Sequence, residues 1–565
     1  MSLNFNTLKY VHVDIEKVKL EFSKLISDFI NAKSAKEQIS LMYKINEYKD
    51  EIETNLSLAH VRFTINTQDK YYSKENDYND EISPIIEELV NKYYKAVFNA
   101  KYKSSLIKEF GKNIFDIIEV KLKAFDPKIM DDLVKENKLT SQYQKLIASA
   151  KIKFKGKTYN LPGMSKFSQD QDRRTRSSAT KAISKWFESH CEEFDKIYDD
   201  LVHVRDEMAK KLGYENYVQF AYYRLGRVDY DAKDVESYRD QVYKYLVPVT
   251  KKLFKRQAKR LGLKNMKSQD YNLNFLSGNA TPKGNKEYLV NSAMEMYDEM
   301  SKETSEFFRF MVNANMMDLE SKPGKAGGGY CTTFPSYKTP FVFANFNGTS
   351  GDGDVLTHEM GHAFMAYCCK DVKLSEYTWP TYEACEIHSM SMEFFAYPWI
   401  EKFFKEDTEK YKFSHLADAI TFIPYGVAVD EFQHFVYEKV NVTPLERRLK
   451  WREIEKKYLP HIKYNTEFME NGGRWFRQSH IFTTPFYYID YTLAQVCAFQ
   501  FFNLMNINKD DAWNKYVDLC KLGGSKSFLN LLKAVKLDNP FKNGCIKKVV
   551  IHLNEYLDKF DDSKM

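Results

Sequence analysis

The sequence of 565 residues lacks the features that mark membrane and secreted proteins. Its first residues contain no charged segment followed by an apolar one, which a signal peptide requires. No run of about 18 apolar residues occurs, so a membrane span is not expected. The eight cysteines contain no CxxC pair and form no dense framework. These absences predict a cytoplasmic protein with reduced thiols.

A strong excess of charge of one sign is also missing. Lys plus Arg number 84 and Asp plus Glu 78, and the small positive excess is dispersed. The densest basic run, residues 251–267, has apolar residues at helical spacing and is interpreted as a solvated helix face. Because no basic stripe occurs, nucleic acid is not expected as a partner. The hydrophobic fraction of 43% is enough for a sizeable core.

Glycine and proline are scarce over long stretches, and most of the chain has helical periodicity. A short β-hairpin is expected at 151–161, and two short strands with a loop at 322–351. The predicted fold class is therefore mainly α. The domain boundary is expected near 165–180, which divides the chain into an N-terminal helical domain, 1–175, and a second domain, 176–565, which contains the motif described next.

One motif points to chemistry. Residues 358–362 read HEMGH, which is an HExxH motif. On a helix, positions four apart lie on one face, so His358 and His362 would both reach one zinc ion. Glu359 would then take a proton from the metal's water, whose pKa zinc lowers to about 7. The alternative is an ordinary helix whose two histidines pack or face solvent.

A catalytic zinc ion needs a third protein ligand and one open position. The extended motif HExxHxxGxxH is excluded, because Met365 stands where Gly is needed and Cys368 where His is needed. The other candidates are carboxylates on the following helical segment, of which one would bind zinc and another would orient a ligating histidine. Spacing alone does not choose among them. They are Glu383, Glu386 and Glu393.

HEMGH, with EIHSMSME beginning 24 residues after the second histidine, resembles the thimet oligopeptidase and oligoendopeptidase F family of zinc peptidases, above all its bacterial oligoendopeptidase F branch. The resemblance implies that Glu386, with Ser389 three residues later, is the third zinc ligand. It extends to GGGYCTTFPSYKTPFVFANFNG before the motif, IPYGVAVDEFQHFVYE after it, and KFKGKTYNL with DRRTRSSATKA near residue 170. The likeness therefore covers roughly residue 150 to the C-terminus.

The segment RWFRQSHIFTTPFYYIDYTLAQ (474–495) resembles the part of the family that binds substrate and the tetrahedral intermediate. The resemblance assigns these roles to His480, Tyr488 and Tyr491, whose N–H and O–H groups suit an oxyanion. The histidine-to-tyrosine spacing departs slightly from that of thimet oligopeptidase, so Tyr487 is a rival for Tyr488. The alternative is an aromatic-rich core helix.

The family resemblance also implies an architecture and a reaction. Two largely helical halves would surround a deep substrate channel, with a small β-element next to the zinc-binding helix. The strand near 341–346 would pair with the substrate backbone. We expect one zinc ion per chain and internal cleavage of short unfolded peptides. The alternatives are a zinc exopeptidase of dipeptidyl carboxypeptidase or carboxypeptidase type, and an inactive helical peptide-binding protein. The sequence leaves the oligomeric state and the physiological peptide open.

Overall fold

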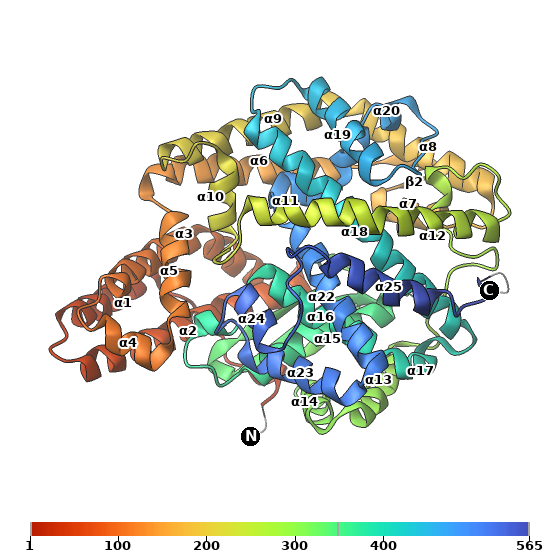
Figure 1. The fold of residues 1–565 in the computed structure, drawn as a ribbon. Coiled ribbons are helices and arrows are strands. Elements are labelled where there is room, and N and C mark those ends of the chain that lie inside the picture. Colours follow the sequence, from red (N-terminus) through yellow and green to blue (C-terminus); the bar gives the residue numbers. More distant parts are fainter. Residues whose placement is uncertain (1–2, 347, 349, 563–564) are drawn as a thin grey trace.

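The computed structural model describes residues 3–346, 348, 350–562 and 565. Its N-terminal part is a helical bundle (Figure 1). The N-cap residue of helix α1 is Asp14, whose carboxylate accepts hydrogen bonds from the backbone N–H groups of Glu16 and Lys17. Its apolar residues recur every three or four positions and are buried on one face. The bundle consists of α1 (Ile15–Asn31), α2 (Ala35–Ile65), α3 (Lys70–Phe98), α4 (Lys103–Phe110) and α5 (Asn113–Lys123).

The next part contains the predicted hairpin followed by more helices. The two strands of the hairpin are antiparallel, as expected, and Ile152 pairs with Tyr159. The elements are α6 (Met130–Ala148), β1 (Ile152–Phe154), β2 (Lys157–Tyr159), α7 (Leu161–Ser168), α8 (Arg173–Ser189), α9 (Cys191–Lys211), α10 (Tyr217–Arg224), α11 (Ala232–Gln241), α12 (Val247–Arg260), α13 (Lys286–Met300) and α14 (Lys302–Asn313).

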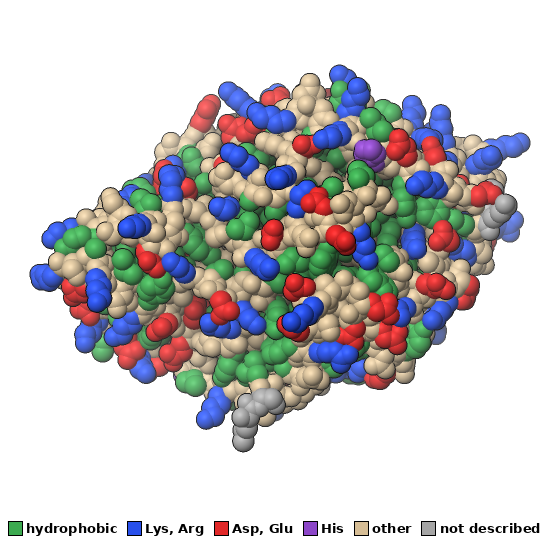
Figure 2. Space-filling view, turned by 60° about the horizontal axis from the view of Figure 1, so that its bottom comes forward, with side chains coloured by type: hydrophobic (Ala, Val, Ile, Leu, Met, Phe, Trp, Pro, Cys, Tyr) green, Lys and Arg blue, Asp and Glu red, His purple; other side chains and the backbone are tan. Residues whose placement is uncertain are grey.

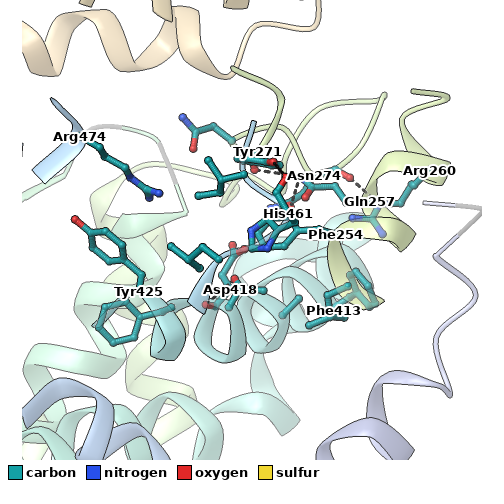
Figure 3. Close-up of a pocket in the computed structure, with 17 residues that line it drawn as sticks. Phe254, Gln257, Arg260, Tyr271, Asn274, Phe413, Asp418, Tyr425, His461 and Arg474 are labelled. Atoms are coloured by element: carbon teal, nitrogen blue, oxygen red, sulfur yellow. Dashed lines mark hydrogen bonds between the residues drawn. The ribbon is translucent and has the colours of Figure 1, made fainter. Parts of the chain in front are cut away.

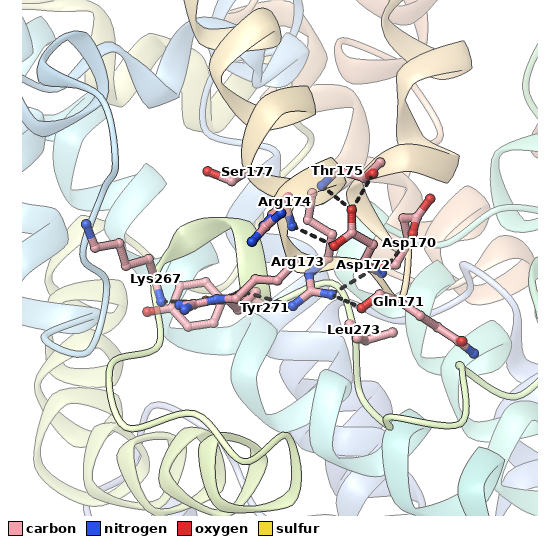
Figure 4. A network of polar contacts seen from close by, with 12 residues as sticks. Asp170, Gln171, Asp172, Arg173, Arg174, Thr175, Ser177, Lys267, Tyr271 and Leu273 are labelled. Atoms are coloured by element: carbon pink, nitrogen blue, oxygen red, sulfur yellow. Dashed lines mark hydrogen bonds and ion pairs between the residues drawn. The ribbon is translucent and has the colours of Figure 1, made fainter. Parts of the chain in front are cut away.

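A polar network ties the start of α8 to a distant loop (Figure 4). The Asp172 carboxylate caps α8 by accepting hydrogen bonds from two backbone N–H groups. Arg173 and Arg176 donate to the fully buried Asp270, at 2.8 and 3.0 Å. These charge-assisted contacts hold the loop that contains Asp270 and Tyr271 against the helix.

A three-stranded sheet lies before the predicted metal helix. Its strands are β3 (Met317–Glu320), β4 (Tyr330–Phe334) and β5 (Thr339–Phe346), in the order β3-β5-β4. The first pair is parallel and the second antiparallel. Two of these strands match the prediction; β3 has only four residues and was not predicted.

The rest of the chain is helical, as predicted. In Figure 1 the yellow to yellow-green helices α11 and α12 run across the middle of the view, with α6, α8, α9 and α19 above them and α15, α16, α22 and α23 below. The helices are α15 (Gly351–Cys368), α16 (Tyr382–Phe395), α17 (Glu401–Phe404), α18 (Thr408–Glu438), α19 (Pro444–Tyr458), α20 (Glu467–Glu470), α21 (Ser479–Thr483), α22 (Tyr488–Ile507), α23 (Lys509–Leu522), α24 (Phe528–Ala534) and α25 (Cys545–Leu557).

The buried side chains form two hydrophobic clusters. The smaller one contains residues of the N-terminal bundle between Val13 and Ile118, together with Leu374 and Tyr377 from the connection between α15 and α16. The larger cluster contains most of the other core residues, including those of α6 and the hairpin. The predicted domain boundary after residue 175 stays a prediction.

The surface mixes charges of both signs. Figure 2 shows Lys and Arg side chains interspersed with Asp and Glu, without a stripe of one sign on this face. Among the described residues, no helix combines the length and apolar content that a membrane crossing requires. The prediction of a mainly α fold with two largely helical halves and a small β-element beside the predicted metal helix is confirmed.

Candidate metal centre and active site

Helix α15 presents both histidines of the HExxH motif on one face. It begins at Gly351, and Asp352 and Asp354 in its first turn suit the positive end of the helix dipole. The ring centroids of His358 and His362 lie 5.2 Å apart, as expected for residues four apart on a helix. Both imidazoles therefore face the same space.

The glycine of the motif lets α16 approach α15 closely. A Cβ atom at Gly361 would lie 2.7 Å from the carbonyl oxygen of His388 and 2.7 Å from Cα of Ser389. Because both neighbours are backbone atoms, any larger residue would push the two helices apart. This contact brings Glu386, one turn earlier on α16, next to the two histidines.

Three side chains converge as a set of possible metal ligands. His358 Nε2 lies 3.4 Å and His362 Nε2 3.5 Å from Glu386 Oε2. Among the described residues, these three are the group of His, Cys, Asp and Glu side chains placed closely enough to share a metal ion. Two imidazoles and one carboxylate are a donor set that suits zinc and leaves a coordination position open. The Ser389 hydroxyl donates to Glu386 Oε2 at 3.0 Å and helps to orient the carboxylate.

A second layer of polar side chains holds one of the histidines. His358 Nδ1 lies 2.6 Å from Glu393 Oε1, and Glu393 Oε2 lies 2.7 Å from His415 Nε2 on α18. This series of hydrogen bonds continues to Tyr397, whose hydroxyl lies 2.7 Å from His415 Nδ1. A carboxylate on Nδ1 leaves Nε2 of His358 free to bind a metal, which is the usual arrangement around ligating histidines.

The charges of this cluster shift the pKa values of its members. Burial alone would raise the pKa of Glu386, but the two imidazoles outweigh it and lower this pKa. In Glu393 the hydrogen bonds from His358 and His415 outweigh burial and lower the pKa to about 2. Burial would lower the pKa of His358, but the carboxylates hold it well above its usual value. Both carboxylates are therefore ionised at neutral pH.

The remaining candidates on α16 point elsewhere. Glu383 is fully buried, accepts a hydrogen bond from the Thr381 hydroxyl at 2.7 Å, and is not in the group of possible ligands. Burial, with the charge of Asp490, raises its pKa to about 8. His388 is fully buried too, and burial lowers its pKa to about 4, as suits a packed core residue.

The catalytic candidate Glu359 faces the glycine-rich segment before β4. A Cβ atom at Gly329 would lie 3.8 Å from Glu359 Oε1 and 3.4 Å from the carbonyl oxygen of Phe343. The predicted role of the strand near 341–346 is contradicted for Val342 and Phe343, because β5 lies in the middle of the sheet and these two residues pair with both β3 and β4. The pairing of β4 with β5 extends only as far as Phe343, so for residues 344–346 this role stays a prediction. An outer edge is also available on β4, which starts beside Glu359.

His480 on α21 is oriented by two neighbours. The Gln478 side-chain N–H donates to His480 Nδ1 at 2.8 Å, while its oxygen accepts from the Tyr425 hydroxyl at 3.0 Å. Burial lowers the pKa of His480, so the ring is neutral at neutral pH. With Nδ1 accepting, the proton lies on Nε2, which can donate to a substrate oxygen.

Tyrosines of α22 and the residue before it surround this histidine. The ring centroids of Tyr487, Tyr488 and Tyr491 lie 5.7, 5.0 and 5.7 Å from that of His480. The Tyr487 hydroxyl donates to Glu386 Oε1 at 3.2 Å, and burial with the nearby Glu386 raises the pKa of Tyr491 to about 12. Tyr487, the rival in the sequence prediction, is thus the tyrosine that hydrogen-bonds to a candidate ligand.

The residue just before these tyrosines has a strained backbone conformation. Phe486 has φ of 65°, in the left-handed region that non-glycine residues rarely adopt. Its N–H donates to Gln433 Oε1 at 3.0 Å, and its carbonyl oxygen accepts from Arg227 at 2.6 Å. Such strain persists only where surrounding contacts enforce it, and it is frequent at functional sites.

Sequence reasoning missed two residues that support the site. His415 shares Glu393 with His358, and Gln478 orients His480. His415 lies on another helix with no recognisable spacing from the motif. Gln478 is two residues before His480 and lies within the segment 474–495. This position in the sequence was the signal that could have identified it.

Comparison with protein families agrees with this geometry. The sequence pattern of the Peptidase M3 N-terminal domain matches residues 5–125, and that of Peptidase family M3 matches residues 166–551. The chain belongs to peptidase family M3. The predicted resemblance and the assignment to the peptidases are therefore confirmed. Membership of this metallopeptidase family also implies a metal ion.

Individual relatives agree with the family. A structure described as an oligoendopeptidase F is 48% identical, with complete coverage of both chains and a TM-score of 0.94. PZ peptidase A, solved with an inhibitor, is 49% identical over 99% of this chain and 100% of its own, also with a TM-score of 0.94. The oligoendopeptidase F homolog of Borreliella burgdorferi is 26% identical over 238 residues, which span 40% of this chain and 39% of that relative.

Proposed function

We propose that this M3 peptidase is a cytoplasmic zinc endopeptidase that hydrolyses internal bonds of short unfolded peptides. The observation that carries the proposal is the convergence of His358 Nε2 and His362 Nε2 on Glu386 Oε2, within 3.5 Å. The names of the full-length relatives, oligoendopeptidase F and PZ peptidase A, support the same substrate class.

His358, His362 and Glu386 would hold one zinc ion per chain. When bound, zinc supplies a Lewis acid that lowers the pKa of water and polarises the scissile carbonyl. The hydrogen bond that His358 Nδ1–H donates to Glu393 fixes the ring of His358 in the tautomer that presents Nε2. Glu386 is turned toward the histidines by Ser389.

Glu359 is the proposed general base. It forms no ion pair with any of the described Lys, Arg or His side chains, so its carboxylate is available for proton transfer. It would take a proton from the attacking water and deliver it to the leaving amine nitrogen, as the C–N bond breaks. The small residue Gly329 leaves room beside it for the substrate backbone.

His480 and the tyrosines that surround it would stabilise the oxyanion. His480 carries its proton on Nε2 and can donate it as a hydrogen bond. Tyr491 and either Tyr487 or Tyr488 would add hydroxyl donors. The raised pKa of Tyr491, about 12, keeps this hydroxyl protonated at neutral pH. The outer edge of β4 would bind the substrate as an added strand.

Two other functions remain as alternatives. A zinc exopeptidase would use the same ligands but would release only terminal fragments. An inactive peptide-binding protein would bind peptides without cleaving them. The intact Glu359 favours an active enzyme, because a binding protein does not need a general base.

Cleavage of a short internally quenched peptide tests the proposal. Wild type and Glu359→Gln are compared with and without chelator, and the products are identified by mass. We expect internal cleavage that stops with chelator and falls at least about 10²-fold in the variant. Terminal fragments alone would identify an exopeptidase, and no turnover by zinc-loaded wild type would favour the binding protein.

A further inference from the structure

A cavity of about 270 Å³ lies beside the tyrosines that surround His480. Figure 3 shows the residues that line it. Helices α12 and α18 form two of its sides, and the loops around Tyr271, His461 and Arg474 complete it. Ligand pockets for whole small molecules measure about 300–1,000 Å³, so this cavity suits a single long side chain.

Aromatic contacts connect the cavity to the site. Phe422 and Tyr425 line it, and their ring centroids lie 5.6 and 5.8 Å from that of Tyr488. The Tyr425 hydroxyl also donates to Gln478, which orients His480. A peptide bound at His480 could therefore place one of its other side chains in the cavity.

The charged groups of the lining differ in their pairing. Arg260 pairs with Asp562, and Arg474 lies 3.0 Å from Glu455. Asp418 accepts a hydrogen bond from Asn274, yet it forms no ion pair with any Lys, Arg or His that the structure describes. The carboxylate of Asp418 is therefore the charge in this lining that is left for a ligand.

The groups around Asp418 suit a cation. His461 is stacked on Phe254 with centroids 3.9 Å apart, and both of its ring nitrogens are buried without a hydrogen-bond partner. Burial and the charge of Arg474 lower the pKa of His461 to about 3, so the ring is neutral and can accept a hydrogen bond. The rings of Phe422 and Tyr425 offer the faces that a guanidinium group stacks against.

We propose that this cavity is a substrate pocket for a basic side chain, arginine above all, with Asp418 as its ion-pair partner. The guanidinium would donate to Asp418 and to the free nitrogen of His461, while its flat face would contact Tyr425. This proposal rests on the proposed function, since it assigns a preference to the same peptidase site.

Matched peptides test the pocket. Quenched peptides carry arginine, or its neutral isostere citrulline, at each position in turn on either side of the cleaved bond. At one position we expect wild type to favour arginine about tenfold in kcat/KM, the effect of one hydrogen-bonded charge pair. In Asp418→Asn this preference should vanish through a higher KM, while cleavage of the citrulline peptide stays within about twofold.

Glu409→Gln is the control, because Glu409 is an exposed acid on the same helix. It should keep the arginine preference. Equal cleavage of both peptides at every position, or an equal loss for both in Asp418→Asn, would overturn the proposal. A preference for a glutamate peptide that disappears in Arg474→Gln would also overturn it, because the pocket would then bind anions.

A binding measurement separates the pocket from catalysis. The affinities of the arginine and citrulline peptides are measured by fluorescence anisotropy with Glu359→Gln, alone and combined with Asp418→Asn. An arginine preference that depends on Asp418 supports the pocket even if wild type cleaves nothing, in which case only the proposed function fails. No preference in Glu359→Gln contradicts the pocket even if wild type is an active endopeptidase.

Discussion

The two walls of the candidate site are built in different ways. On the α15 and α16 wall, polar atoms contact one another directly, from Glu386 through His358 and Glu393 to His415. On the α21 and α22 wall, aromatic rings pack around His480, and Tyr487 is the tyrosine with a hydrogen bond to Glu386. The first wall offers candidate ligands and charges, whereas the second offers candidate donors held in place by packing.

The supports of the two walls differ as well. The ligand wall depends on the four-residue spacing of one helix and on the close helix contact at Gly361. The aromatic wall depends on side chains far away in the sequence. Arg205 donates to the carbonyl oxygen of Phe482 on α21 at 2.6 Å, and Gln433 holds the strained Phe486. Local rules therefore explain the first wall better than the second.

Removing the proposed general base should give the largest effect. Glu359→Gln keeps the three candidate ligands and removes the group that accepts the proton. We expect kcat to fall about 10²–10⁴-fold while bound zinc, measured by atomic spectroscopy, stays at the wild-type level. A loss of activity together with a loss of zinc would mean that Glu359 supports the metal rather than the chemistry.

The second prediction concerns the distant support of the aromatic wall. Glu136 on α6 lies 2.6 Å from Arg205 and 2.9 Å from Arg224, and is 4% exposed. Burial opposes its ionisation, but the two arginines lower its pKa from 4.5 to about 2. Because about 1.4 kcal/mol corresponds to each pKa unit, Glu136→Gln should lower the free energy of unfolding by about 3 kcal/mol at neutral pH.

The pH dependence gives the sign of this effect. A carboxylate whose pKa is lowered in the folded protein stabilises it above the unfolded pKa of 4.5, and this contribution is lost as the pH falls toward about 2. Urea unfolding at several pH values should therefore show the difference between wild type and Glu136→Gln shrinking below pH 4.5. Glu119→Gln, in an exposed i,i+4 pair with Lys123, is the matched control and should change stability little.

The third prediction tests the second layer of the ligand wall. Glu393→Gln removes the negative charge beside His358 Nδ1 and leaves all three candidate ligands unchanged. The zinc dissociation constant should rise about 10–100-fold. It is measured by competition with a chromogenic chelator, so turnover is not needed. The control is Glu299→Gln, which changes an exposed acid that accepts a hydrogen bond from Trp399. Equal zinc affinities of wild type, Glu393→Gln and Glu299→Gln would exclude a role of Glu393 in metal binding.

The sequence predicted most of the ligand wall. A fixed helical spacing places His358 and His362 on one face, and the family resemblance selected Glu386 from three carboxylates that spacing alone could not separate. His415 could not be predicted in this way, because its contact with Glu393 depends on how α18 packs against α16. The helices and the hairpin were predicted because their sequence signals are local. The central place of β5 was not predicted, because strand order depends on pairing between distant segments.

The aromatic wall leaves one choice open, and a pair of variants decides it. Tyr487 and Tyr488 are adjacent, so their side chains point in different directions from the start of the helix. A shift of one residue in the match to the family would therefore change which tyrosine faces the site. The Tyr487 hydroxyl lies 3.2 Å from Glu386, whereas the Tyr488 ring packs against Phe422 and Tyr425.

We therefore expect Tyr487→Phe to lower kcat about tenfold, the value of one charge-assisted hydrogen bond, and Tyr488→Phe to change it less. Steady-state kinetics on one peptide compares the two variants directly. A larger loss in Tyr488→Phe would mean that substrate binding moves this hydroxyl to the reacting carbonyl, and that the hydrogen bond of Tyr487 to Glu386 only orients the ligand.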